Sequence, residues 1–367
     1  MTVVQQQQLA AARSAFAEGA SLPETLLAAP LQRSWQRSRE AGVQPAQPPF
    51  HAPLRSTPAR LDDAQDRRLA RCVQPELEQL WSAFGARGWT LFCANREGLV
   101  VAQRAHGFED APLLSPIQVG RRLAEADIGT TAPSISMADD VPALVRGNEH
   151  YLQCFAPVFC LSEPLHDLHG AVCGAIDITG LGERDPVLLQ GYFRQAALAS
   201  ENRMFDGLQD VHLLAVQHDP RWLGSPLQGL LAVQEDGRLR AANRVARRLL
   251  GLPRRGPVPL VMLDELFQGA SSSQRRRLLQ AGPVLRVRIA EGSAVHVQHL
   301  RGPRRARIAR AVASDTPAPS AAAPLRDQQR AAARRAVHAA NGNMSLAARQ
   351  LGISRTTLYK LKGDGGN

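Results

Sequence analysis

The stretch Ser345–Lys362 constrains the fold of this chain more than any other part of the sequence. Its two small residues, Ala347 and Ala348, allow one helix to lie close against another. Gly352 can end that helix in a left-handed conformation, which a residue with a Cβ atom adopts only at a cost. Ser354 can then cap the next helix by accepting a hydrogen bond from a free backbone N–H group. The pattern therefore predicts two short helices joined by a tight turn, which is a helix-turn-helix.

The second of these helices is predicted to have one apolar face and one polar face. The apolar face holds the helix against the rest of its domain through Ile353, Leu358 and Leu361. The polar face points to where phosphates and base edges of DNA would lie, and it carries Ser354, Arg355, Thr356, Thr357, Tyr359 and Lys360. Arg355 and Lys360 suit contacts with phosphate or guanine, and Thr357 and Tyr359 suit contacts with bases or the DNA backbone.

Together with a preceding helix, residues 326–340, and the break Asn341–Asn343, this stretch resembles the Fis-type DNA-binding domain of bacterial transcription regulators. The resemblance covers Leu325 to Lys362. It implies that double-stranded DNA is a partner and that the helix before the motif takes part in a dimer. A homodimer that contacts a two-fold DNA site, with RNA polymerase as a further partner, is therefore expected. The alternative is a plain helical hairpin that packs on protein.

The charge of the chain is concentrated at its C-terminal end. Residues 301–367 hold 13 Lys and Arg against 3 Asp and Glu, so they carry +10 of the formal net charge of +11. Both lysines of the chain, Lys360 and Lys362, lie in the predicted second helix or directly after it. A nearly neutral body with a basic end is typical of a sensor joined to a DNA-binding domain.

Length and composition predict a multidomain protein of the cytoplasm. A chain of 367 residues with 44% apolar content has material for two or three domains. No apolar run is long enough to cross a bilayer, and the first residues lack the pattern of a signal peptide. Five cysteines without a CxxC pair are typical of a reduced compartment.

We expect an α+β multidomain fold with five segments along the chain. The Pro-rich stretch that ends the first segment and the Pro/Ala-rich fourth segment are predicted to form no regular element. The segments are a helical leader with a Pro-rich linker (1–61), a first α/β unit (62–205), a second α/β unit (225–312), a Pro/Ala linker (313–324) and the all-α helix-turn-helix (325–367).

Within the first α/β unit, periodicity predicts two long helices and four strands. The helices span residues 62–86 and 186–205, and the strands span 89–94, 99–102, 151–159 and 170–179, with a polar loop at 161–169. The second helix suits either the core of this unit or a helix pair between subunits. The second unit is predicted to contain a hairpin over residues 229–243, a basic helix at 244–250 and strands at 284–289 and 294–300.

Residues 30–205 resemble the GAF sensor domain of acetoin-regulator-type transcription factors. The motifs that carry the resemblance are Ser34–Arg37, Ile128–Ala132, Gly147–Tyr151, Gly174–Gly180 and Glu201–Phe205. Residues 227–300 resemble a PAS domain. These resemblances imply a small organic effector, such as an alcohol, ketone or aldehyde.

Members of that family usually carry an ATPase domain between the sensor and the helix-turn-helix. Such a domain needs a phosphate-binding loop of the form GxxxxGK[ST], and neither lysine of this chain follows such a glycine. We therefore expect a ligand-responsive, DNA-binding regulator without ATPase activity and without a cofactor. A chain that pairs with an ATPase-bearing relative and modulates it is the first alternative.

Six residues of the first unit are candidates for contacts with the effector, because ligand pockets combine aromatic walls with a few polar groups. They are Trp89, Phe92, Thr130, Thr131, His150 and Tyr151. The alternative for the aromatic residues is ordinary core packing, and the alternative for the threonines is capping of turns.

Histidines and cysteines of the first unit raise two further possibilities. His150, Cys154, Cys160, His166 and His169 match no compact zinc spacing, so no metal site is expected. A cysteine-dependent methionine sulfoxide reductase of the GAF type is a second alternative function, with Cys93, Cys154, Cys160 and Cys173 as its thiols. A DNA-binding end would be unusual on such an enzyme, so no catalytic residue is expected.

Overall fold

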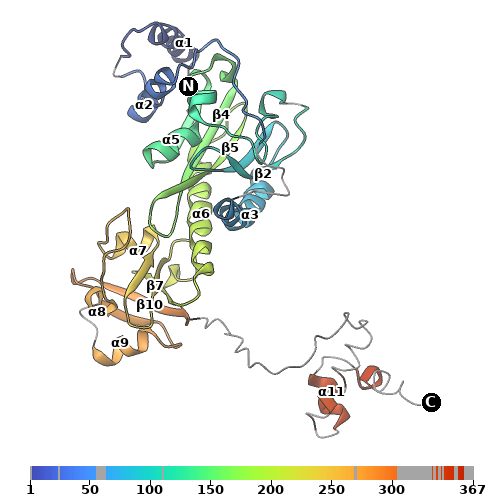
Figure 1. The fold of residues 1–367 in the computed structure, drawn as a ribbon, viewed down its shortest axis with the longest axis vertical. Helices are drawn as coiled ribbons and strands as arrows, with labels where there is room; N and C mark the ends of the chain where they lie inside the picture. Colours follow the sequence, from blue (N-terminus) through green and yellow to red (C-terminus); the bar gives the residue numbers. More distant parts are fainter. Residues whose placement is uncertain are drawn as a thin grey trace, which may run out of the picture. The chain divides into compact units, whose positions relative to one another are not determined.

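A computed structural model describes most of the chain as two compact units, residues 1–307 and 308–367. The first contains two five-stranded sheets, and the second contains short helices (Figure 1). No helix within the described residues is both long enough and apolar enough to span a membrane. The described residues are 2–23, 25–54, 63–109, 111–267, 271–303, 333, 336–337, 340, 343–350 and 354–358.

The first sheet is antiparallel throughout, with the strand order β2-β1-β5-β4-β3. The hairpin of β1 and β2 is confirmed, and its turn is held by the side chain of Asn95, which accepts hydrogen bonds from the backbone N–H groups of Glu97 and Leu99. The strands are β1 (Trp89–Asn95), β2 (Val100–Ala105), β3 (Ala143–Arg146), β4 (Val158–His166) and β5 (Val172–Leu181).

Two long helices, α3 (Ala64–Phe84) and α6 (Pro186–Met204), cover one face of this sheet. Each begins at an aspartate, Asp63 or Asp185, whose carboxylate accepts hydrogen bonds from the backbone N–H groups of the first turn. Leu189 and Phe193 of α6 are buried against Ile176 and Ile178 of β5 and the apolar side of α3. Of the two roles considered for this helix, the structure therefore supports a place in the core of the first unit.

The opposite face of the sheet is covered by the leader and by short elements between the strands. The Pro-rich segment forms no helix or strand in its described part, residues 43–54, as predicted. It packs on the first sheet unit through backbone hydrogen bonds from Phe50 to Asp127 and from Gln153 to Pro45. The elements on this face are α1 (Val3–Ala17), α2 (Ala29–Glu40), η1 (Pro112–Leu114), α4 (Glu125–Ile128), α5 (Ala132–Asp139), η2 (Gly147–Glu149) and η3 (Gln153–Phe155).

The predictions of a strand at 151–159 and of a loop at 161–169 were wrong. Most of the first segment forms η3 and its flanking turns, whereas β4 extends to His166. The segment resembles a strand in sequence because it contains apolar residues, and two of these, Tyr151 and Leu152, are fully buried outside any strand. The polar residues Glu163 and His166 of β4 are also buried, because α6 and the second sheet unit cover them.

The second sheet is also antiparallel, with the order β8-β7-β6-β10-β9. Its strand β6 lies before residue 225, where we expected the second unit to begin. The apolar run Leu213–Val216 has no alternation, so periodicity alone does not distinguish it from a continuation of α6. The elements of this unit are β6 (His212–Gln217), β7 (Gly229–Val233), β8 (Leu239–Ala242), α7 (Arg244–Leu249), α8 (Leu263–Leu266), α9 (Ser272–Leu278), β9 (Leu285–Arg288) and β10 (Ala294–Arg301), with η4 (Phe205–Gly207) and η5 (Pro220–Trp222) between them.

Candidate functional site

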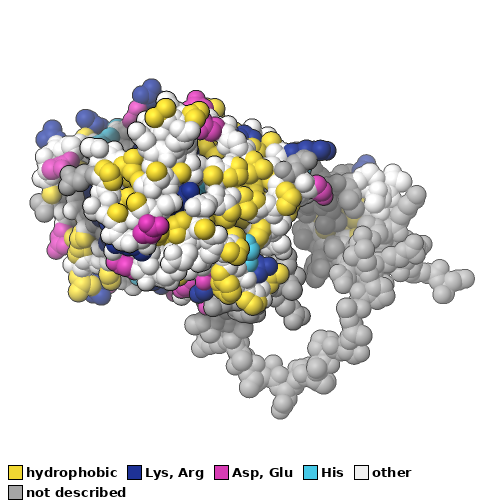
Figure 2. Space-filling view, turned by 90° about the horizontal axis from the view of Figure 1, so that it is seen from above, with side chains coloured by type: hydrophobic (Ala, Val, Ile, Leu, Met, Phe, Trp, Pro, Cys, Tyr) yellow, Lys and Arg dark blue, Asp and Glu magenta, His cyan; other side chains and the backbone are white. Residues whose placement is uncertain are grey.

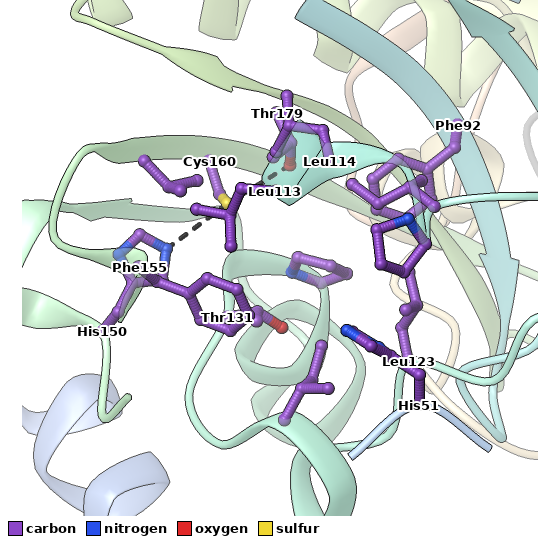
Figure 3. Close-up of a pocket in the computed structure, with 15 residues that line it drawn as sticks. His51, Phe92, Leu113, Leu114, Leu123, Thr131, His150, Phe155, Cys160 and Thr179 are labelled. Carbon is purple, nitrogen blue, oxygen red and sulfur yellow. Dashed lines mark hydrogen bonds between the residues drawn. The ribbon is translucent and has the colours of Figure 1, made fainter. Parts of the chain in front are cut away.

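The first sheet and the elements on its leader side enclose a small cavity of about 50 Å³ (Figure 3). A single buried water needs about 10–15 Å³ on this scale, so the cavity has room for a molecule of a few heavy atoms. Its wall is mainly apolar. The lining residues are His51, Phe92, Leu113, Leu114, Pro116, Ile117, Leu123, Ile128, Thr131, Pro133, His150, Phe155, Val158, Cys160 and Thr179.

A chain of polar side chains runs along one side of the cavity (Figure 3). The ring of His150 lies 3.0 Å from the Gly147 carbonyl through Nδ1 and 3.4 Å from the Cys160 Sγ through Nε2. Nδ1 must donate to the carbonyl, so Nε2 of the neutral ring accepts from the thiol. Thr179 Oγ1 lies 3.2 Å from the same sulfur and 2.5 Å from Asp177 Oδ1.

These polar groups are neutral near pH 7. The pKa of His150 is lowered to about 4, chiefly by burial; the hydrogen bond to the Gly147 carbonyl opposes this shift, and the nearby Arg13 guanidinium adds to it. Burial raises the pKa of the Cys160 thiol far above its ordinary value. A small, uncharged cavity with a few hydrogen-bonding groups suits a neutral polar molecule and not an ion.

His51 also lines the cavity, and sequence reasoning missed it because it lies in the Pro-rich segment. Its Nδ1 atom is buried and has no hydrogen-bond partner among the described residues. Burial lowers the pKa of His51, and the positive charge of Arg121 lowers it further, so the ring is neutral at pH 7. Nδ1 therefore keeps an unused position for a hydrogen bond. A histidine in an irregular segment carries no periodic signal that would have identified it.

Of the six residues predicted to contact an effector, Phe92, Thr131 and His150 line the cavity. The other three lie elsewhere. Trp89 packs against Phe159 in the core on the α3 and α6 side. Thr130 is bonded to the hydroxyl groups of Ser34 and Ser38 in α2. Tyr151 packs edge-on against the rings of Phe16 and Trp35.

The leader is tied directly to the cavity wall. Arg13 Nη1 donates to the His150 carbonyl at 2.9 Å, and Trp35 Nε1 donates to the Glu149 carbonyl at 2.7 Å. Arg37 forms an ion pair of 2.6 Å with Glu125 in α4. A shift of His150 would therefore change the contacts that α1 and α2 make with this wall.

The buried carboxyl group of Asp177 predicts a pH effect on stability. Burial raises its pKa from 3.8 to about 8, although the hydrogen bond from Thr179 acts in the opposite direction. The folded state therefore holds this proton more tightly than the unfolded chain. Its contribution to stability is fully present below pH 3.8 and is lost as pH rises to about 8.

Asp177→Asn should remove this dependence, because the amide keeps an acceptor for Thr179 and carries no charge. The urea midpoint of the variant, relative to the unmodified chain, is expected to rise steadily between pH 5 and pH 8. The exposed Asp236→Asn serves as a matched control. Parallel midpoint curves for Asp177→Asn and the unmodified chain would contradict the assigned environment.

The cysteines lie in environments that disfavour their thiolate forms. Burial is the largest cause of a raised pKa at each of them: Cys72, Cys93, Cys154, Cys160 and Cys173. A reactive thiol needs a lowered pKa. Within the described residues, His, Cys, Asp and Glu form no group of three or more that could hold a metal ion.

In the C-terminal unit, the described residues form a small apolar cluster around α11 (Met344–Gln350). Ala347 and Ala348 are buried, in accord with close helix packing. Asn343 Oδ1 accepts hydrogen bonds from two backbone N–H groups at the start of α11. The other members of the cluster are Ala333, Val337, Ala340 and Leu358.

Residues 355–358 are helical, and Leu358 faces the apolar cluster. The predicted cap is confirmed, because Ser354 Oγ accepts from the Thr357 backbone N–H at 3.1 Å. Arg355, Thr356 and Thr357 are exposed. The other two predicted contact residues, Tyr359 and Lys360, lie outside the described residues, as do Gly352, Ile353, Leu361 and the linker 313–324.

The visible face of the first unit mixes acidic, basic and hydrophobic side chains (Figure 2). No large field of one charge gathers on the described part of this face. This agrees with the nearly neutral charge of residues 1–300.

Two family models match this chain. Residues 5–198 match the model described as MimR, N-terminal domain. Residues 325–362 match the model described as bacterial regulatory protein, Fis family. The first match includes the leader, in agreement with the packing of α1 and α2 on the sensor.

Curated relatives match about half to two thirds of the chain. It is 25% identical over 196 residues to the propane 2-monooxygenase operon transcriptional activator MimR of Mycolicibacterium goodii, which covers 53% of this chain and 32% of that protein. It is 25% identical over 251 residues to the acetoin catabolism regulatory protein of Cupriavidus necator, and this match covers 65% of this chain and 37% of that protein. The matched part thus spans about a third of the length of these relatives.

Two solved structures align with parts of the chain. A chain in the crystal structure of the E. coli DhaR(N)-DhaL complex covers 74% of this chain and 99% of its own length, with 16% identity and a TM-score of 0.38. The reduced form of fRMsr of Staphylococcus aureus covers 40% of this chain and 98% of its own length, with 10% identity and a TM-score of 0.26.

Proposed function

Because this chain belongs to the family defined by the MimR N-terminal domain, we propose that it is a transcription regulator that binds DNA and responds to a small molecule. The named relatives are transcriptional activators or regulatory proteins. The observation that carries the proposal is the match of residues 325–362 to the Fis family of regulators. The exposed Arg355 and Thr357 on a helix capped by Ser354 have the arrangement that this role requires.

The helix-turn-helix supplies the contacts with double-stranded DNA. Arg355 and Lys360 contact phosphates or guanine, while Thr357 and Tyr359 contact bases or the backbone. Two copies of the chain pair, so that two reading helices contact the half-sites of a two-fold operator. The basic charge of residues 301–367 adds sequence-independent affinity that falls with salt.

The effector is a small neutral alcohol, ketone or aldehyde that occupies the cavity in the first sheet unit. The size of the cavity and its neutral polar groups support this class of molecule. His51 and Thr131 are the side chains placed to bond its oxygen, while Phe92 and Phe155 contact its apolar part. Acetoin belongs to this class, and it appears in the names of two relatives.

A ligand changes DNA binding only if it binds two arrangements of the protein with different affinity. The cavity wall offers a route, since His150 is bonded to the leader through Arg13. The sequence contains no phosphate-binding loop of the form GxxxxGK[ST]. We therefore propose that this chain regulates transcription without ATPase activity.

The first test is a footprint of the purified chain on its own upstream DNA, over a salt series and against random DNA. Protection of a two-fold site that persists against random competitor supports a sequence-specific regulator. Weak, sequence-blind binding that salt removes would overturn it and would favour the alternative in which the chain acts by pairing with an ATPase-bearing relative. Copurification with such a relative would then identify that role.

Leu113→Trp should abolish the effector response without loss of DNA binding. Leu113 is half-buried at the cavity wall, so an indole at this position fills the space that a ligand would occupy (Figure 3). We expect the shift in melting temperature produced by acetoin, acetone or 2-propanol to be lost from the variant. The measurement is thermal unfolding over a concentration series of each compound.

Leu188→Trp is the matched control, because Leu188 is 52% exposed on α6 and lines no described cavity. It should respond to the compounds as the unmodified chain does. An unchanged response in Leu113→Trp would show that the effector binds elsewhere.

A further inference from the structure

We propose that residues 1–307 contain a second ligand site, which binds a small molecule that carries a phosphoryl group. The site is a pocket of about 530 Å³ where the first sheet unit meets the second. It is separate from the cavity described above and shares no lining residue with it. This inference does not depend on the proposed response to a neutral effector.

The pocket is strongly basic, since five arginines line it. Arg194 comes from α6 of the first unit, and the other four come from the second unit: Arg244, Arg247, Arg248 and Arg254. Among the described residues, none forms an ion pair with Arg194, Arg248 or Arg254. The guanidinium group matches the geometry of phosphate oxygens and keeps its charge at every physiological pH.

Arg247 shows that the site is built and is not a chance gathering of surface charge. The residue is 1% exposed, and its guanidinium group is held by the Ala242 carbonyl at 2.9 Å and the Pro253 carbonyl at 2.8 Å. Its third nitrogen, Nη2, is buried and has no hydrogen-bond partner among the described residues. Nη2 of Arg244 is in the same situation. Two buried donors without partners at one pocket call for an acceptor there.

The acidic groups of the pocket do not cancel this charge. Asp140 is already bonded to Arg255 and to His166, at 2.6 Å in each case. Glu163 is 1% exposed, and its Oε1 atom has no hydrogen-bond partner among the described residues. Burial raises the pKa of Glu163 to about 7, against the effects of Arg244 and Arg194. At neutral pH its carboxyl group is therefore partly protonated and can donate to a bound oxyanion.

The pocket also joins the two sheet units of residues 1–307. Arg244 begins α7 and forms an ion pair of 3.0 Å with Glu201 of α6, which in turn accepts a hydrogen bond from the backbone N–H of His166. Asn243 donates to Asn202 at the same junction. A phosphoryl group bonded by arginines of both units would strengthen this junction.

The test is isothermal titration of the full chain with inorganic phosphate at constant ionic strength set by sodium chloride. Saturable binding is expected, with an affinity that falls on the order of threefold to tenfold in Arg248→Gln and in Arg194→Gln. Both side chains are exposed, so these variants are expected to fold. Arg240→Gln removes the same charge from an exposed position outside the pocket, and its affinity should not change.

Three results would overturn the proposal. The first is the absence of saturable phosphate binding. The second is an equal loss of affinity in Arg240→Gln, which would attribute binding to the general positive charge of the chain. The third is acetate binding as strong as that of phosphate, which would show a site for any anion.

Discussion

Trp35→Ala should destabilise the sensor by about 3–5 kcal/mol, the range measured for removal of large aromatic side chains from protein cores. Trp35 is 0% exposed and packs against the rings of Phe16 and Tyr151, at centroid distances of 6.1 and 5.8 Å. Its Nε1–H also donates to the Glu149 carbonyl. The substitution leaves a void in the core and a buried carbonyl without its donor.

The loss is large relative to the stability of a typical domain, about 5–15 kcal/mol. The leader should separate from the sensor first, because Trp35 is the largest of its fully buried side chains. Urea unfolding measures the change in free energy, and limited proteolysis of residues 1–54 measures the release of the leader. His150 follows Glu149 directly, so the response to acetoin, acetone or 2-propanol should weaken as well.

Trp222→Ala provides the matched control, since Trp222 is 46% exposed. It should change stability by less than about 0.5 kcal/mol, as is usual for surface positions. If Trp35→Ala shifted the urea midpoint no more than Trp222→Ala, the leader would not be an integral part of the sensor.

Arg355→Ala should remove most of the sequence-specific DNA binding of the chain. A bidentate contact between an arginine and guanine contributes about 1–3 kcal/mol of discrimination per site, and a two-fold operator contains two such sites. Arg355 is exposed next to the capping Ser354, so its removal leaves the apolar cluster of the C-terminal unit intact. Binding should be measured by footprinting and by titration against specific and random DNA.

The salt dependence separates the two contacts that Arg355 could make. Loss of preference for the operator, with unchanged affinity for random DNA, indicates a contact with a base. A uniform loss on both DNAs, with a salt slope reduced by about one, indicates a contact with phosphate. Arg240→Ala controls for the change in net charge. An unchanged footprint with Arg355→Ala would reject a role for this residue in DNA binding.

Local patterns in the sequence were sufficient for several elements of the fold. The hairpin of β1 and β2 was predicted because the Asn95–Gly98 turn separates two apolar runs. The helices α3 and α6 were predicted from their apolar spacing. The cap at Ser354 was predicted from the turn that precedes it. Each of these features depends on interactions between residues that are close in the sequence.

The cavity depends on contacts between distant segments, and only part of it was predicted. Phe92, Thr131 and His150 line it as expected, whereas Tyr151 packs on the leader. His51 was missed because a Pro-rich segment gives no sign of where it will pack. In the sequence, an apolar residue that will line a cavity looks the same as one that will pack against a neighbouring side chain.

The sequence by itself determined the helix-turn-helix pattern, the uneven charge and the α+β composition of the sensor units, since these follow from short-range periodicity, capping and residue counts. Only the tertiary structure decided that the leader completes the sensor and that β4 carries buried polar groups. It also decided that Arg194 and Arg247, which are 53 positions apart, share one pocket. The physical reason is that burial of polar groups is set by what packs against a segment, and that packing partner is not encoded within the segment.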